Sequence, residues 1–391
     1  MDPTLGARVR RTFARLYGGP APRVAFAPGR VNLIGEHTDY NDGFVFPMAI
    51  TRGVAIAFRL RDDRQLRGYA TSFQESREVA LDGLAPGSLS GWLAYVAGVA
   101  WALEDSGARL TGMDFAVDSD LPVGAGLSSS AAIEVAMARA CADTTGLSWD
   151  PMPMATLCRR AENAFVGVPC GLMDQFASAA SREGCATILD CRTLETQAVP
   201  LPGEAVIAVM DTGVRRELAR SAYQDRRAAC ETAVAGLQSA FPAVRALRDV
   251  SAEMLERVKS TLDPVVYRRA RHVVEENPRP HAMAAALRTG DLAAAGRLMN
   301  ASHESLRRLY QVSSDELDRL VEQARAHPAC FGARMTGAGF GGCAIALVRR
   351  ESAAAFLQTV QDAYGSQAPS REAWFVTPPA GGARLEGAER A

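Results

Sequence analysis

Six residues between positions 30 and 40 concentrate polar chemistry in a short stretch of the chain. The stretch supplies a cation, two carboxylates, an imidazole and directional hydrogen-bonding groups, at Arg30, Asn32, Glu36, His37, Asp39 and Tyr40. Apolar runs flank it, at residues 24–27 before Pro28 and at residues 44–50 after the stretch. We predict a short strand that the proline stops, a loop that holds binding groups, and a second buried strand. The alternative is a solvated surface loop.

A glycine- and serine-rich segment at residues 121–132 is the second motif, Leu-Pro-Val-Gly-Ala-Gly-Leu-Ser-Ser-Ser-Ala-Ala. Gly124 and Gly126 allow a ligand to approach the backbone closely, and the serines open a helix that we expect from Ser129 to Thr145. The first amides of a helix lack internal partners and carry partial positive charge, so phosphate oxygens fit there. Serine hydroxyls could add hydrogen bonds or a magnesium ligand. Taken alone, the motif is better explained as a plain capped turn, and its value for a phosphate site depends on the other motifs.

Two further segments combine glycines or acids in a way that suggests a site. Residues 335–343 contain four glycines within six positions between two apolar runs, which indicates an unusual backbone path or close approach to another chain or a ligand. A plain glycine-rich hairpin is the alternative. Asp174 follows Gly171 and is expected to begin a helix, where the helix dipole and a nearby arginine would keep it ionised. Glu162, on the preceding helix, is a candidate metal ligand.

Composition excludes several classes of protein. The 391 residues carry a formal net charge of −1, which gives no electrostatic footprint for nucleic acid or an anionic membrane. No apolar run approaches the roughly 20 residues that a membrane span needs, and the first residues do not resemble a signal peptide. Eight cysteines are scattered without a C-x-x-C pair, so neither a disulfide framework nor a zinc site is indicated. We expect a cytoplasmic protein.

The chain contains a single lysine, Lys259, beside 42 arginines. That lysine follows no glycine-rich loop. A P-loop needs a lysine after its glycines, and a protein kinase needs one on a strand. Neither fold can be built here, so any nucleotide chemistry must use another phosphate cradle.

Hydrophobic periodicity predicts a mixed chain of strands and helices. Strands are expected at residues 52–60, 65–71, 77–81, 113–118, 206–210, 331–335, 343–348 and 373–377. Helices are expected at residues 91–105, 129–145, 151–165 and 351–364, with Asp150 as a cap and a mostly helical region up to His327. We place a division near residue 190, giving regions 1–190 and 191–391, and expect the tail from Pro378 to Ala391 to be disordered.

In this order and at this spacing, the motifs resemble those of the GHMP small-molecule kinases. The segment from Gly29 to Tyr40 resembles the galactokinase group of that family in particular. The similarity continues through residues 91–96, 221–227, 269–274, 302–307 and 335–343, and so covers nearly the whole chain. Two departures are small: Asp42 stands where the group often has glycine, and Arg308 stands where an acid is common.

The resemblance implies an α+β, two-domain GHMP kinase. It would have an N-terminal ribosomal-protein-S5-like domain, a C-terminal ferredoxin-like, helix-rich domain, and its active site in the cleft between them. By position, Asp174 and Arg30 match the catalytic pair. Residues matching the sugar-binding set are Glu36, His37, Asp39, Gly171 and Tyr223. Residues matching the ATP site are Trp92, near the adenine, and Gly124, Ala125, Gly126, Leu127, Ser128, Ser129 and Ser130 in the phosphate loop; Ser130 and Glu162 match the Mg²⁺ ligands.

The activity implied is transfer of a phosphoryl group from ATP to the C1 hydroxyl of D-galactose, giving α-D-galactose 1-phosphate, the first committed step of galactose catabolism by the Leloir pathway. Phosphoryl transfer needs mainly positioning and charge neutralisation, which a helix N-terminus, Mg²⁺ and Arg30 could supply without a lysine. A monomer is expected. Two alternatives remain: a sibling kinase for arabinose, galacturonate or N-acetylgalactosamine, and a non-catalytic sugar sensor, which would be expected to have a damaged phosphate loop.

Overall fold

The computed structural model describes residues 3–19, 23–122, 124–215, 219–365 and 369–386. Val123 of the second motif and residues 387–391 of the tail lie outside these ranges. In the described part of the chain, none of the helices combines the length and apolar character needed to cross a bilayer.

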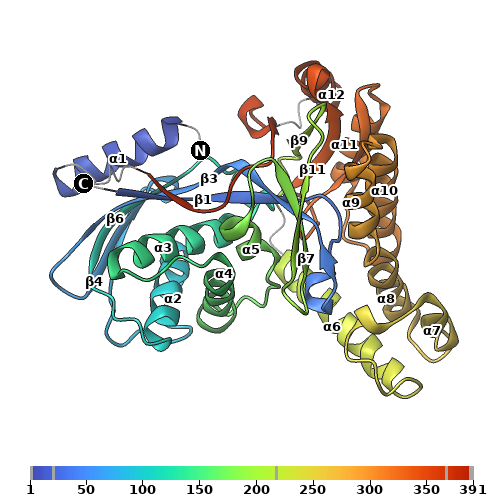
Figure 1. Cartoon of the computed structure of the whole chain (residues 1–391), viewed down its shortest axis with the longest axis horizontal. Helices are drawn as coiled ribbons and strands as arrows, with labels where there is room; N and C mark the ends of the chain where they lie inside the picture. Colours follow the sequence, from blue (N-terminus) through green and yellow to red (C-terminus); the bar gives the residue numbers. More distant parts are fainter. Residues whose placement is uncertain (1–2, 20–22, 123, 216–218, 366–368, 387–391) are drawn as a thin grey trace.

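A six-stranded sheet forms the first layer of the molecule, in the order β13-β1-β3-β6-β4-β5. Its strands are β1 Arg23–Asn32, β3 Pro47–Leu60, β4 Gln65–Ala70, β5 Glu75–Ala80, β6 Met113–Ser119 and β13 Arg384–Glu386. Helix α1 (Pro3–Tyr17) covers one face, and the other face carries α2 (Trp92–Asp105), α3 (Ser129–Thr145) and α5 (Met173–Ala180), with α4 (Pro151–Arg160) packed against these three helices (Figure 1). The predicted helix at residues 151–165 continues past α4 as a π-helical turn, Ala161–Val166.

A second, four-stranded sheet is covered by helices from the second half of the chain (Figure 1). Its order is β10-β11-β9-β12, with β9 Ala205–Asp211, β10 Cys330–Met335, β11 Cys343–Arg349 and β12 Phe375–Thr377. The helices that pack against this sheet are α10 Leu292–Ser305, α11 Asp315–Ala326 and α12 Ala353–Tyr364. The other helices of the second half are α6 Ala219–Gln238, α7 Ala252–Arg257, α8 Pro264–Glu276 and α9 Arg279–Arg288. A small third sheet joins β2 (Phe44–Val45), β7 (Cys185–Asp190) and β8 (Thr196–Pro200).

Strand β9 contributes to both large hydrophobic clusters of the molecule. Ala205, Ile207 and Val209 pack with the cluster around the six-stranded sheet, whereas Val206, Ala208 and Met210 pack with the cluster under the later helices. Successive side chains of a strand point to opposite faces, so one buried strand can serve two cores. Because β9 packs into both clusters, the two cores do not separate cleanly along the chain. The predicted domain division near residue 190 therefore stays a prediction.

Two predictions about chain ends and strand ends are wrong. The tail was expected to be disordered from Pro378, but β13 pairs with β1, with Glu386 opposite Val24 and Arg384 opposite Phe26. This pairing fills the hydrogen-bonding edge that β1 would otherwise expose. Pro28 does not stop β1 either: the strand shifts register between Pro28 and Arg30 and continues to Asn32. Pro28 itself pairs in register with Gly53, and the irregularity follows it.

Candidate active site

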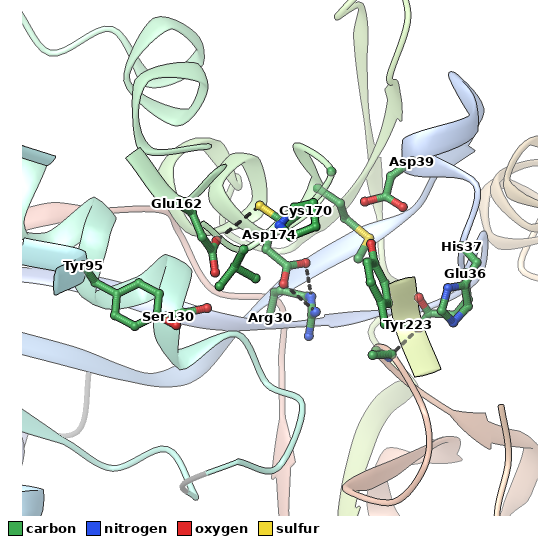
Figure 2. Close-up of a pocket in the computed structure, with 16 residues that line it drawn as sticks. Arg30, Glu36, His37, Asp39, Tyr95, Ser130, Glu162, Cys170, Asp174 and Tyr223 are labelled. Carbon is green, nitrogen blue, oxygen red and sulfur yellow. Dashed lines mark hydrogen bonds and ion pairs between the residues drawn. The ribbon is translucent and has the colours of Figure 1, made fainter. Parts of the chain in front are cut away.

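A cavity of about 370 Å³ opens between the first sheet and the later part of the chain, and the predicted catalytic and sugar-binding residues line it (Figure 2). Half of its lining comes from β1, the following loop and the segment before α5, and helices α2, α3, α5 and α6, the π-helical turn and the glycine-rich loop supply the rest. The polar lining residues are Arg30, Glu36, His37, Asp39, Ser130, Glu162, Asp174 and Tyr223. The cavity therefore collects side chains from all four sequence motifs.

Arg30 and Asp174 form a bidentate ion pair at the centre of the cavity (Figure 2). Arg30 Nε donates to Asp174 Oδ1 and Arg30 Nη2 donates to Asp174 Oδ2, both at 2.8 Å. The third guanidinium nitrogen, Nη1, donates to the backbone oxygen of Gly126 at 2.6 Å. The hydroxyl of Ser128 also donates to Asp174 Oδ2, at 2.5 Å. Strand β1, the phosphate loop and the first turn of α5 are thus joined at one charge pair. The position of Asp174 at the start of a helix, beside an arginine, agrees with the expectation from the sequence.

Glu36 lines the cavity but is already held by several donors of the protein. Its Oε1 accepts the backbone N–H of Gly337 at 2.7 Å and its Oε2 accepts Asn32 Nδ2 at 3.0 Å. Arg334, which is fully buried, approaches Oε1 at 3.5 Å. Burial raises the pKa of Glu36, while Arg334 and Arg30 oppose that shift. Glu36, which the sequence predicts to bind the sugar, therefore also links the loop after β1 to the glycine-rich loop through a hydrogen bond.

His37 is buried in a left-handed backbone conformation, with φ of 63°. Burial lowers the pKa of its imidazole to about 3, so the ring is neutral near pH 7. Its Nδ1 lies 2.7 Å from the hydroxyl of Tyr40, and its Nε2 makes no hydrogen bond of good geometry within the described residues. The ring also lies against Tyr223 of α6, with ring centroids 5.7 Å apart. His37 lines the cavity, and a neutral imidazole can form a hydrogen bond with a hydroxyl group.

Asp39 and Gly171 are packed so tightly that only glycine fits at position 171. A Cβ built on Gly171 would lie 1.8 Å from Asp39 Oδ2. Burial, with a contribution from the nearby Asp174 carboxylate, raises the pKa of Asp39 to about 7. Gly171 therefore makes room for a carboxylate that ionises near neutral pH.

The two glycine-rich motifs pack directly against each other. Gly124 and Gly126 have φ of 67° and 76°, in the left-handed region that favours glycine. A Cβ on Gly337 would lie 2.9 Å from Gly126 O, and one on Gly342 would lie 2.8 Å from Ala125 O. The second loop thus makes the close approach that the sequence indicated, but to a segment of the same chain. Helix α3 begins at Ser129 directly after the first loop, as predicted.

Ser130 and Glu162 lie together at the other end of the cavity from His37 and Glu36 (Figure 2). Glu162 is 5% exposed, and its Oε2 accepts Gln175 Nε2 at 2.6 Å and Cys170 Sγ at 3.3 Å. Burial raises the pKa of Glu162 to about 7, although donors including Cys170, Gln175 and Ser130 lower it. The described residues contain no group of three or more His, Cys, Asp or Glu side chains arranged to hold a metal. A carboxylate and a hydroxyl nonetheless fit Mg²⁺, which commonly takes one or two protein oxygens together with phosphate oxygens and water.

A second cavity, of about 300 Å³, shares Tyr95 and Ser130 with the first. Its walls are mainly apolar and include Trp92, Val117 and Ile133. Trp92 is nearly buried, and its indole N–H donates to Glu75 at 3.0 Å. An apolar slot next to a phosphate loop is suited to a flat aromatic base. The placement of Trp92 near the adenine stays a prediction, and this cavity is where the adenine would bind.

Sequence reasoning missed several residues around the site. Cys170 and Gln175 contact Glu162, Tyr95 joins the two cavities, and Arg334 faces Glu36. Gln175 directly follows Asp174 in the sequence, and this adjacency to a predicted catalytic acid was the available signal. Nothing local marked Arg334, since it meets Glu36 across 298 residues of chain.

Lys259, the single lysine, lies exposed on the surface and pairs with Glu256 at 2.6 Å. Asp42 adopts φ of 57°, which explains why a glycine suits its position. Arg308 pairs with Glu304 on the surface. Neither departure from the family pattern, Asp42 or Arg308, lines the cavity.

Comparison with known proteins gives matches along most of the chain. Residues 11–60 match the galactokinase galactose-binding signature, residues 94–182 match the N-terminal domain of GHMP kinases, and residues 283–366 match their C-terminal domain. A galactokinase from Roseiflexus sp. (strain RS-1) is 46% identical over 356 residues, which cover 91% of each chain.

Solved structures agree with these matches. The structure of Lactococcus lactis galactokinase complexed with galactose superposes with a TM-score of 0.91 at 35% identity, over 97% of this chain and 99% of that one. The mevalonate kinase of Methanococcus jannaschii has a TM-score of 0.63 at 18% identity, over 91% of this chain and 98% of that one, and so shares the fold alone.

Proposed function

The chain belongs to the galactokinases within the GHMP kinase family and has galactokinase activity, and we propose that it carries out this reaction in the cavity around Asp174 and Arg30. The reaction would transfer the γ-phosphoryl group of ATP to the C1 hydroxyl of D-galactose, giving α-D-galactose 1-phosphate. The observation that carries this proposal is the bidentate Arg30–Asp174 pair, because it links the sugar-binding loop to the phosphate loop through Gly126 O.

Two regions of the cavity divide the substrates between them. We call Glu36, His37, Asp39, Gly171 and Tyr223 the sugar end, and residues 124–130 with Glu162 the phosphate end. In this proposal the sugar end presents acceptors, a neutral imidazole and a tyrosine hydroxyl to the galactose hydroxyls. Asp174 accepts the proton of the C1 hydroxyl as the new bond forms, and Arg30 holds Asp174 in place and offsets charge on the transferring group.

The phosphate end would bind ATP through backbone N–H groups of the loop and the start of α3. Ser130 and Glu162 would hold Mg²⁺, which when bound would neutralise negative charge on the phosphates. The apolar cavity beside Trp92 would take the adenine. No lysine is needed in this arrangement, since the helix N-terminus, Arg30 and the metal would supply the positive charge.

A substrate panel tests the proposal directly. The purified protein with ATP and Mg²⁺ would be assayed for kcat/KM with galactose, glucose, arabinose, galacturonate and N-acetylgalactosamine. A site built to bind one hydroxyl discriminates by about 10⁴-fold against an analogue that leaves its buried polar groups unpaired. Glucose differs from galactose at C4 and should be phosphorylated orders of magnitude more slowly. Galacturonate should be poor because Glu36 would repel a second carboxylate, and the one lysine lies elsewhere on the surface.

The alternatives predict different results in the same panel. Equal kcat/KM for galactose and glucose, or a preference for the uronic acid, would contradict the galactose assignment and favour a sibling kinase. Sugar binding without any ATP consumption would indicate a sensor. The uninterrupted serines 128–130 and the acids Glu162 and Asp174 argue against a sensor.

A further inference from the structure

Gln175 connects two buried carboxylates beneath the phosphate end of the cavity. Its single amide nitrogen, Nε2, donates to Glu162 Oε2 at 2.6 Å and to Glu134 Oε2 at 3.1 Å. Gln175 lies on α5 directly after Asp174, and Glu134 lies on α3 one turn beyond Ser130. Both Gln175 and Glu134 are completely buried. The amide therefore lies between the proposed metal ligand and an acid that faces no solvent.

Two oxygens of this cluster have no hydrogen-bond partner when Glu134 is an ionised carboxylate. They are Glu134 Oε1 and Gln175 Oε1. A carboxylate and an amide oxygen can only accept, so two such atoms cannot satisfy each other, and a buried unpaired polar atom costs about 1–3 kcal/mol. Turning the amide over would not help, because its oxygen would then face both carboxylates.

A proton on Glu134 Oε1 would supply the donor that these two oxygens lack. A carboxylic acid and a primary amide can form a pair of parallel hydrogen bonds, in which the amide N–H donates to the acid carbonyl and the acid O–H donates to the amide oxygen. The bond from Gln175 Nε2 to Glu134 Oε2 is one half of that pair. The two unpartnered oxygens are the atoms that the other half requires.

We propose that Gln175 is a positioning residue for Glu162, and that Glu134, as a neutral acid, fixes the Gln175 amide so that its second N–H is aimed at Glu162. This inference rests on the proposed function, since it takes Glu162 as a ligand of Mg²⁺. Cys170 Sγ donates to the same Glu162 oxygen at 3.3 Å (Figure 2), so two donors from the segment around Asp174 converge on Glu162 Oε2. Metal-ligating carboxylates usually have such supporting hydrogen bonds.

Electrostatics favours the same arrangement. Burial and the neighbouring Glu162 carboxylate both raise the pKa of Glu134 well above its ordinary value. Two ionised carboxylates sharing one amide in a dry environment would repel each other strongly. A neutral Glu134 leaves the negative charge on Glu162, where a cation can use it.

Three variants test the role of Gln175. Gln175→Leu removes both donors, Glu162→Ala removes the proposed ligand, and Ser178→Ala is the matched control. Ser178 lies on the same helix and donates a buried hydrogen bond to Pro28 O at 2.8 Å, away from Glu162. The measurements are the Mg²⁺ concentration for half-maximal rate, Mn²⁺ binding in the presence of a non-hydrolysable ATP analogue, and the Kd for galactose.

For Gln175→Leu we expect both metal measurements to weaken by about 10- to 100-fold, as for other residues that support metal ligands. The galactose Kd should stay within about twofold, and Ser178→Ala should leave metal binding within about twofold. An unchanged metal requirement in Gln175→Leu, with a large change in Glu162→Ala, would overturn the inference and leave the proposed function standing. No change in either variant would overturn both, since Glu162 would then not be a ligand.

Glu134 gives an independent test that does not depend on the folding of Gln175→Leu. Glu134→Gln keeps one donor and one acceptor in place of the neutral acid, so metal binding should stay within about twofold of the parent. Difference infrared spectroscopy of the full chain at pH 7 should show a protonated-carboxyl C=O band that this variant lacks. The absence of this band from the parent-minus-variant difference spectrum, or a loss of metal binding in Glu134→Gln as large as in Gln175→Leu, would overturn the inference.

Discussion

The sugar end and the phosphate end of the cavity are both buried, but they are completed in different ways. At the sugar end, Glu36 already has donors from the protein, including the Gly337 N–H and Asn32, and faces the buried Arg334. At the phosphate end, Glu162 and Glu134 lie under neutral donors, and burial raises the pKa of both acids. Glu36 at the sugar end thus faces the fixed positive charge of Arg334, whereas Glu162 at the phosphate end accepts hydrogen bonds from the neutral donors Cys170 and Gln175.

This difference matches what each end would bind. Galactose is neutral, so its binding groups can be satisfied and rigid before it arrives, which reduces the entropic cost of binding. The triphosphate of ATP would arrive with a cation, so acids without a fixed positive partner can serve it. Arg30 stands between the two ends and already pairs with Asp174. Five predictions test this comparison, from the largest expected effect to the smallest.

Asp174→Ala removes the group that both ends share. We expect kcat to fall by at least about 100-fold, the usual scale for a positioned base, while galactose still binds. Steady-state kinetics and calorimetric galactose binding would measure the two effects separately. Near-normal turnover in this variant would show that Asp174 does not act on the chemical step. Arg30→Ala should also reduce turnover, because Asp174 would lose its bidentate partner.

Gly171→Ala tests how rigid the sugar end is. The new methyl group would collide with Asp39 Oδ2, so either Asp39 or the segment before α5 must shift. Overpacking of this kind destabilises the fold by about 1–3 kcal/mol. Displacement of Asp39, a proposed sugar ligand, should also weaken galactose binding, by about 5- to 150-fold where the same free energy is lost from binding. Gly167→Ala is a useful control: no atom outside the local chain lies within 4 Å of its Cβ position, so any strain from its φ of 77° stays local. Equal galactose affinity in Gly171→Ala and the parent would mean that this end adapts.

The pH dependence tests the charge of Asp39. Its pKa is raised to about 7, so the carboxylate is ionised above that pH and becomes neutral below it. With saturating Mg²⁺ and ATP, kcat/KM for galactose should fall as the pH drops through 7, to about a tenth of its plateau at pH 6. Asp39→Asn should lower the plateau and remove this step. A parent profile that stays flat down to pH 5 would contradict an ionised Asp39 as a sugar ligand.

The same group makes a stability prediction with a defined sign. Because folding raises the pKa of Asp39, the folded state binds its proton more tightly than the unfolded state does. Stability from this group is present at about pH 4 and is lost as the pH rises through 7. Asp39→Asn should therefore raise the free energy of unfolding relative to the parent, and the increase should be larger at pH 8 than at pH 4. Denaturant unfolding at the two pH values measures this difference.

Lys259→Ala should have the smallest effect. The side chain is on the surface and pairs with Glu256, so we expect activity within about twofold of the parent. A severe loss of ATP affinity in this variant would mean that the phosphate end needs the lysine after all. Arg271→Ala, on the same surface beside Glu275, is the matched control.

Local sequence determined the parts of the site that depend on neighbours along the chain. The glycines at 124 and 126, the serines that follow and the apolar spacing beyond them predict a loop and a helix from Ser129 to Thr145, and that helix has these ends. The single lysine excluded P-loop and protein-kinase chemistry without any structure. Position after a glycine placed Asp174 in the first turn of a helix.

Only the tertiary structure decided which groups face one another and how much water reaches them. Arg30 and Asp174 meet across 144 residues, and Glu36 and Arg334 across 298. The tail became a strand because β1 offered an unpaired edge, which no property of the tail itself reveals. The charges of Asp39, Glu134 and Glu162 depend on burial, and burial is created by packing from distant segments. Residue types set which chemistry is available, and the long-range contacts select which of it the protein can use.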